Sequence, residues 1–210
     1  MTANMFLSRV AIDIKNQNAL RALSNPEILH GMIETSLPRE HSRCLWRVDE
    51  LGGRTYLLLM SEERPDLFSI ANQIGSDEKP CETKDYQPLL NRITVGSIWR
   101  FRLVANPVVS QPRPGKKRGK LKAITIHEHQ REWLTRQAEK NGFILSSDQF
   151  DTIRSEWRTF RNKSNNVSIL QVTFEGLLTV SDAAKFQDSL LGGIGRGKAY
   201  GMGLLTVMTP

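Results

Sequence analysis

Cysteines and long apolar runs are both scarce in this chain of 210 residues. The two cysteines, Cys44 and Cys81, stand alone, which excludes a disulfide framework and a CxxC metal-binding pair. No apolar run approaches the roughly 18–20 residues that a membrane-spanning helix needs. The N-terminal segment MTANMFLSRVAIDI also lacks the charged, apolar and small-residue regions of a signal peptide. These absences predict a reduced cytoplasmic protein without a membrane segment.

Acidic residues are absent from residues 96–122, although that stretch carries eight basic ones. The chain as a whole has a formal net charge of +7. Because a solvated helix face normally mixes charges of both signs, this one-sided stretch predicts a surface for an anionic partner such as RNA. Six of the basic residues fall in the segment QPRPGKKRGKLK: Arg113, Lys116, Lys117, Arg118, Lys120 and Lys122.

Hydrophobic residues make up 39% of the chain, which is enough for a folded globular protein. The hydrophobic periodicity predicts two consecutive βαββαβ units, and hence an α+β fold with two antiparallel sheets whose helices lie on one face. In the first half we expect strands at 5–14, 44–51, 54–62 and 97–107, with helices at 26–37 and 67–75. In the second half, basic loop 110–122 precedes a helix at 128–142, strands at 150–160 and 167–178, a helix at 182–191 and a strand at 203–208.

The segment GGIGRGKAYGMG, at residues 192–203, begins like a nucleotide-binding Gly-x-x-x-x-Gly-Lys loop. That motif requires Ser or Thr after the lysine and a helix after the loop, whereas Ala199 and a predicted strand follow here. Glycines still allow the backbone to approach a phosphate closely. The segment therefore predicts a phosphate contact made by Gly195, Arg196, Gly197 and Lys198. The alternative is a tight helix-to-strand connection with solvated charges.

Histidine offers one candidate for chemistry. His30 lies on the predicted helix 26–37, between apolar residues. An imidazole that titrates near neutrality can act as acid or base in phosphodiester cleavage, although a lone helical histidine can also be structural. The triplet His127-Glu128-His129 has no further Cys or His at zinc spacing, so we expect no metal site there.

The segment RSEWRTFRNKSNN interleaves basic and aromatic residues. Such a pattern can hold phosphates and stack bases, or it can form an exposed hairpin whose aromatic rings pack inward. On a strand, Arg154 and Arg158 would share one face. The basic residues of this segment are Arg154, Arg158, Arg161 and Lys163.

Five segments in order, MFLSRV, ILHGMIE, FRLVANPV, VTFEGLLTVSD and GIGRGKAYGMGLLTV, make the chain similar to the CasE family. These proteins are CRISPR repeat-RNA endoribonucleases of type I-E systems and subunits of the Cascade complex. The resemblance implies tandem ferredoxin-like (RRM-like) domains, at 1–108 and 109–210, that bind the stem-loop of the repeat in pre-crRNA. It also implies metal-independent cleavage at the 3′ base of the stem, without a cofactor, and retention of the crRNA product.

In this resemblance His30 matches the family's active-site histidine. Family members can carry a tyrosine three residues before it and basic residues one and five after it, where this chain has Glu27, Gly31 and Thr35. Candidates to assist His30 instead are Arg39, Arg43, Arg196 and Lys198. The expected reaction is attack by the RNA 2′-OH, giving a 2′,3′-cyclic phosphate and a 5′-OH, with His30 as acid or base. The alternatives are a non-catalytic RRM-like RNA-binding subunit and a protein-binding ferredoxin-like module.

Overall fold

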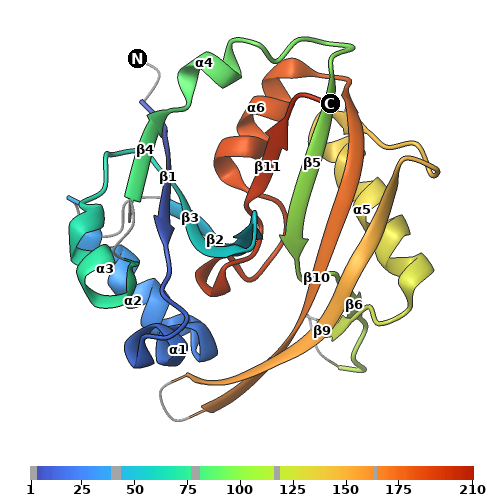
Figure 1. Ribbon diagram of the computed structural model, residues 1–210. Coiled ribbons are helices and arrows are strands. Elements are labelled where there is room, and N and C mark those ends of the chain that lie inside the picture. The colour runs from blue at the N-terminus through green and yellow to red at the C-terminus, as the bar shows by residue number, and fades with distance from the viewer. Residues whose placement is uncertain (1–3, 39–43, 77–80, 116–118, 163–164) are drawn as a thin grey trace.

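The computed structural model describes residues 4–38, 44–76, 81–115, 119–162 and 165–210. Figure 1 shows two β-sheets side by side, the first formed by the blue-to-green part of the chain and the second by the green-to-red part. In the part of the chain that the structure describes, no helix is long and apolar enough to cross a membrane.

The first sheet has the antiparallel strand order β2-β3-β1-β4. One face is covered by three helices, whose apolar side chains pack against Val10, Trp46 and Leu57 of the sheet. The elements are β1 (Phe6–Ala11), α1 (Gln17–Ser24), α2 (Pro26–Ser36), β2 (Cys44–Leu51), β3 (Arg54–Ser61), α3 (Leu67–Ile74) and β4 (Cys81–Asp85).

The three helices of this half each begin at a capping side chain. The side chain of Asn16 accepts hydrogen bonds from the backbone at the start of α1, and those of Asn25 and Asp66 do the same for α2 and α3. Pro26 occupies the first position of α2, where its missing N–H has no helical partner to lose. Local sequence thus fixes where α2, the helix that carries His30, begins.

The second sheet has β5 in its interior, between β11 and β10, and β10 also pairs with β9 and with the short β8. Short elements α4, β6, β7 and η1 join these larger pieces. The bounds are α4 (Gln87–Leu90), β5 (Ile98–Ala105), β6 (Val108–Gln111), β7 (Lys120–Ala123), α5 (His127–Lys140), β8 (Phe143–Ile144), β9 (Phe150–Asn162), β10 (Asn165–Val180), α6 (Ala183–Gly192), η1 (Lys198–Tyr200) and β11 (Leu205–Met208).

Both sheets have the same topology. When the two-residue β8 is set aside, the first strand of each sheet lies between its third and fourth strands in chain order, and the second strand pairs with the third. This arrangement of βαββαβ is ferredoxin-like, so the α+β fold of two tandem ferredoxin-like units is confirmed.

One expected strand belongs to the other sheet. The sequence assigned residues 97–107 to the first unit, but β5 opens the second unit and pairs with β10 and β11. The fourth strand of the first unit is β4, whose sequence CETKD has no apolar alternation because it pairs only with β1 among the described strands. We therefore propose a domain division between β4 and β5 in place of the expected one at 108 and 109.

Two further elements differ from expectation. Helix α1 lies in a stretch where no helix or strand was expected, and the first strand ends at Ala11 instead of at residue 14. The stretch 110–122, expected to be a loop, is in part strand, because its two ends belong to β6 and β7, which pair as a two-stranded ribbon.

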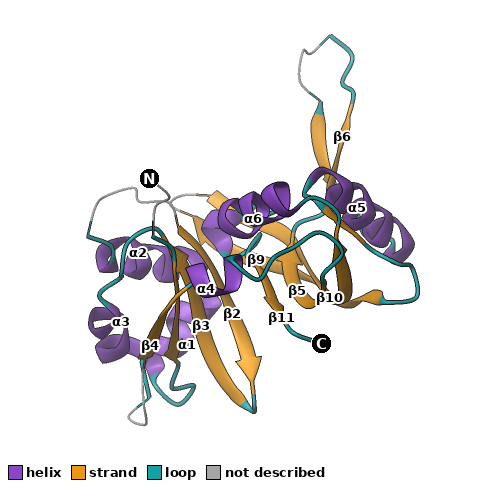
Figure 2. Cartoon of the chain, turned by 90° about the horizontal axis from the view of Figure 1, so that it is seen from above, coloured by secondary structure: helices purple, strands orange, loops and turns teal. Residues whose placement is uncertain are grey.

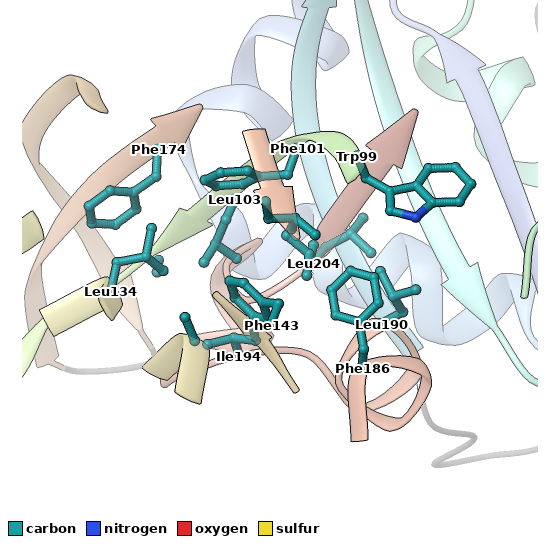
Figure 3. Close-up of a cluster of buried hydrophobic side chains, with 14 of the residues drawn as sticks. Trp99, Phe101, Leu103, Leu134, Phe143, Phe174, Phe186, Leu190, Ile194 and Leu204 are labelled. Carbon is teal, nitrogen blue, oxygen red and sulfur yellow. The ribbon is translucent and has the colours of Figure 1, made fainter. Parts of the chain in front are cut away.

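The second unit contains the larger part of the buried apolar core. Phe101 and Leu103 of β5 and Phe174 of β10 face side chains of α5 and α6 (Figure 3). Ile194 and Leu204, which lie near the two ends of the glycine-rich segment, insert into the same core and are about 1% and 0% exposed. The glycine-rich segment is therefore anchored at both ends.

A buried arginine joins the two units. Arg47 of β2 is 1% exposed, and its guanidinium donates to the carbonyl oxygens of Leu204 (2.7 Å) and Arg102 (3.2 Å) of the second unit. Its Nε donates to both carboxylate oxygens of Asp49, at 3.0 Å. Burial lowers the pKa of Arg47, and the Asp49 carboxylate opposes that shift.

The cluster of hydrogen-bonded side chains around Arg47 continues into the second sheet. Nη2 of Arg47 donates to Oγ1 of Thr206 (2.8 Å), and Nε of Arg102 lies 2.8 Å from a carboxylate oxygen of Glu175. Two clefts of about 700 Å³ and 480 Å³ lie between the units, and Asp49 and Arg102 line both of them. These charged side chains therefore separate the two clefts.

We expect Arg47→Met to lower the free energy of unfolding by about 3–5 kcal/mol, because the buried Asp49 carboxylate loses its closest partner and keeps only Arg102, whose Nε lies 3.7 Å away. The matched double variant Arg47→Met/Asp49→Leu removes both charges and should recover most of that loss. Urea unfolding followed by circular dichroism measures both values. A single variant within 1 kcal/mol of the parent would contradict this role for Arg47.

Candidate nucleic-acid interface

His30 lies on the partly exposed side of α2. Leu29 and Ile33 of the same helix are buried in the first core, whereas the His30 side chain is 33% exposed. Its Nε2 lies 3.3 Å from Oε1 of Glu34, one helical turn later. Its Nδ1 is shielded from solvent and has no hydrogen-bond partner among the residues that the structure describes.

The Glu34 carboxylate also affects the pKa of Cys44, the first residue of β2. Burial and, second to it, the Glu34 carboxylate raise the pKa of the Cys44 thiol to about 11. The Glu34 carboxylate therefore lies near both His30 and the first residue of β2.

The glycine-rich segment packs against the helix that carries His30. Its 3₁₀ helix η1 contacts both α2 and β2. Gly201, which follows η1, has φ +78°, and a Cβ added to it would lie 2.7 Å from the ring of Trp46. Only glycine fits both the left-handed backbone and this close approach.

The charged residues of this segment differ in their surroundings. Nζ of Lys198 donates to the carbonyl oxygen of Gly192 at 2.5 Å, so the lysine helps to terminate α6. Arg196 is exposed, between Gly195 and Gly197, which both have positive φ. Among the predicted phosphate contacts, Arg196 has the more accessible cation.

The long hairpin of β9 and β10 reaches the junction of α1 and α2 (Figure 1). Arg158 donates to the carbonyl oxygen of Leu23 at 2.8 Å, and Asn25 donates to the carbonyl oxygen of Arg161 at 3.3 Å. The structure therefore brings the hairpin, the start of α2 and η1 together from distant parts of the sequence.

Arg154 and Arg158 line the same cleft of about 480 Å³, as their shared strand face predicts. Arg154 pairs with Glu156 at 2.9 Å. The two aromatic residues of the segment RSEWRTFRNKSNN differ: Phe160 is buried against Tyr200, at 4.8 Å between ring centroids, whereas Trp157 is 55% exposed. Of the two rings, Trp157 is the one accessible to a base.

The basic ribbon of β6 and β7 lies elsewhere. It projects beyond α5, away from the helices of the first unit (Figure 2). Arg113, Lys120 and Lys122 are exposed on it. The remaining basic candidates lie outside the described residues: Lys116, Lys117, Arg118, Lys163, Arg39 and Arg43.

A family model described as "CRISPR associated protein" matches residues 5–209. This chain belongs to that family. The resemblance to CasE is also confirmed by individual relatives. The chain is 28% identical over 219 residues to the CRISPR-associated endoribonuclease Cse3 of Thermus thermophilus, with 97% of this chain and 99% of that protein covered.

The second relative is the CRISPR system Cascade subunit CasE of Escherichia coli K12, 28% identical over 160 residues, which cover 72% of this chain and 73% of that protein. Among solved structures, Thermus thermophilus Cse3 bound to an RNA representing a pre-cleavage complex matches with a TM-score of 0.84. That match has 26% identity and covers 98% of this chain and 99% of the other.

One side chain in contact with His30, and one on the element that contacts α2, were not among the candidates from sequence. Glu34 is four residues after His30, and this spacing on a predicted helix is itself a signal for contact. Tyr200 is on η1, the element that contacts α2, and no local pattern links it to a helix so far away in the sequence.

We expect Gly201→Ala to lower the free energy of unfolding by at least about 2 kcal/mol, because it combines left-handed strain with overlap on Trp46. Gly192→Ala is the matched control, since an added Cβ there has no neighbour within 4 Å. Thermal and urea unfolding of both variants measure the difference. Equal stability of the two would show that the glycine-rich segment does not depend on this approach.

Proposed function

We propose that this protein is a metal-independent endoribonuclease that binds the stem-loop of the CRISPR repeat and cleaves at the 3′ base of the stem. The observation that carries the proposal is the contact of the glycine-rich segment with the helix of His30. The relatives named as endoribonucleases, one of them solved with RNA before cleavage, support the same reaction.

RNA supplies its own nucleophile in this reaction. The 2′-OH attacks the adjacent phosphate, and the bond to the 5′ oxygen breaks, which leaves a 2′,3′-cyclic phosphate and a 5′-OH. His30 takes the 2′-OH proton or donates a proton to the leaving oxygen, and such proton transfer is worth about 10²–10⁴-fold. The backbone of Gly195 and Gly197 and the side chains of Arg196 and Lys198 hold the phosphate.

The stem is held by shape and by its phosphates, because the deep major groove of A-form RNA hides the base edges. The ribbon residues Arg113, Lys120 and Lys122 contact the stem, together with Lys116, Lys117 and Arg118. Arg154, Arg158, Arg161 and Lys163 of the hairpin hold the RNA nearer to α2. The protein retains the crRNA and acts in the cytoplasm. It also joins other Cascade subunits, which the name of the Escherichia coli relative supports.

We expect His30→Ala to bind a repeat stem-loop with the parental Kd but to cleave it at least about 100-fold more slowly. His127→Ala, an exposed histidine on α5, is the matched control and should cleave normally. Single-turnover cleavage of labelled repeat RNA in EDTA measures both. Undiminished cleavage by His30→Ala would overturn its role, and loss of parental cleavage in EDTA would overturn metal independence. A parent that binds but never cleaves would favour the non-catalytic RNA-binding subunit.

Neutralising the ribbon should reduce the salt dependence of RNA binding. Each lost phosphate contact lowers the slope of log K against log salt by about 0.9 on a duplex. We therefore expect Lys120→Gln/Lys122→Gln to weaken binding and to flatten this slope by about 1–2, and the triple replacement of Lys116, Lys117 and Arg118 to act in the same direction. Lys84→Gln, on β4 at the other side of the molecule, is the control. An unchanged slope would remove the ribbon from the interface.

A further inference from the structure

The two ring nitrogens of His30 are not equally available to RNA. Nδ1 is shielded from solvent, so an incoming 2′-OH or 5′ oxygen can reach only Nε2 in this side-chain conformation. Nε2 itself lies 3.3 Å from Oε1 of Glu34, an ion-pair contact between successive turns of the helix. The contact that orients the ring therefore occupies the one nitrogen that the proposed reaction needs.

The charges of α2 make this contact incompatible with a bound phosphate at the same nitrogen. The sequence of the helix, PEILHGMIETS, contains two glutamates and no lysine or arginine. A phosphate that approaches Nε2 meets the Glu34 carboxylate as a like charge, and the two anions repel each other at such separations. The Glu34 side chain is 48% exposed, so it has room to turn toward solvent.

We propose that Glu34 holds Nε2 of His30 in the RNA-free protein and yields this nitrogen to the scissile phosphate when the repeat RNA binds. Glu34 is then a positioning residue that acts through His30. It keeps the ring turned with Nε2 outward, and it keeps this nitrogen engaged until a phosphate is placed firmly enough to displace the carboxylate. This inference rests on the proposed endoribonuclease function.

The first test needs no RNA. Diethyl pyrocarbonate acylates an unprotonated, accessible imidazole nitrogen, and mass spectrometry of the full-length folded protein reports the rate at each histidine. We expect His30 to react about two- to threefold faster in Glu34→Gln and Glu34→Ala than in the parent, which corresponds to the loss of a weak i,i+4 pair. His127 and His129 are internal controls whose rates should not change. An unchanged His30 rate in both variants would overturn the contact.

The second test separates binding from chemistry. A repeat RNA with a 2′-deoxy nucleotide at the cleavage position cannot react, and its Kd should fall about two- to fivefold in both Glu34 variants because one negative charge is removed. With the cleavable RNA, the single-turnover rate at saturating protein should stay within about threefold of the parent. Glu132→Gln, which removes an exposed carboxylate 3.7 Å from Arg136 on α5, is the charge control and should change neither value.

The outcomes are distinguishable. If both Glu34 variants bind normally but cleave tenfold or more slowly, Glu34 acts during the chemical step and does not yield the nitrogen, so the proposal is wrong. If the parent itself does not cleave, the proposed function fails, but acylation of His30 still reports whether Glu34 covers Nε2. Using both variants guards against a folding defect in either one.

Discussion

The position of the two units relative to each other depends on the side chain of Arg47. A single guanidinium from β2 is bonded to the carboxylate of Asp49 on its own strand and to backbone oxygens of the second unit. A buried charge is costly unless all its donors are satisfied, so this cluster tolerates little displacement of one unit against the other. These directional bonds act together with apolar packing, since Leu45, Leu58 and Met60 of the first unit share one buried core with the second.

The relation between α2 and the glycine-rich segment follows from that constraint. The segment leaves the core of the second unit at Ile194 and returns to it at Leu204, so its ends move with that unit. Its middle contacts α2 and β2 of the first unit. The histidine and the glycine-rich backbone therefore keep their relative position only because the units do, and the candidate site is a property of both units together.

The sequence predicted most of the fold because its signals were local. The cap of α2 at Asn25, the turn at Gly52 and Gly53 that joins β2 to β3, and the alternation within β5 each depend on a few neighbouring residues. The strand β4 was missed because a short polar strand that pairs only with β1 has no apolar pattern to detect. The wrong unit was assigned to β5 for a related reason, since alternation identifies a strand but not its partners.

The candidate site was likewise predicted only in part from the sequence. Residue type singled out His30, the glycine-rich segment and the basic residues, but contact between them depends on pairing across the whole chain. Arg158 illustrates the limit: its spacing from Arg154 predicted a shared face, whereas its bond to the carbonyl oxygen of Leu23 joins segments that no sequence pattern connects. Arg47 and Asp49, two positions apart on one strand, carried a signal for pairing but none for the carbonyl oxygens to which Arg47 donates.

The ribbon of β6 and β7 has a consequence for how this fold can diversify. It is inserted after β5 and before α5, and it pairs with itself rather than with either main sheet in the part of the chain that the structure describes. A loop between two such paired strands can be lengthened or shortened at a small cost in conformational entropy. The reach of the molecule toward an extended partner can therefore change over generations by insertion or deletion there, while the sheets and the contact between α2 and η1 stay as they are.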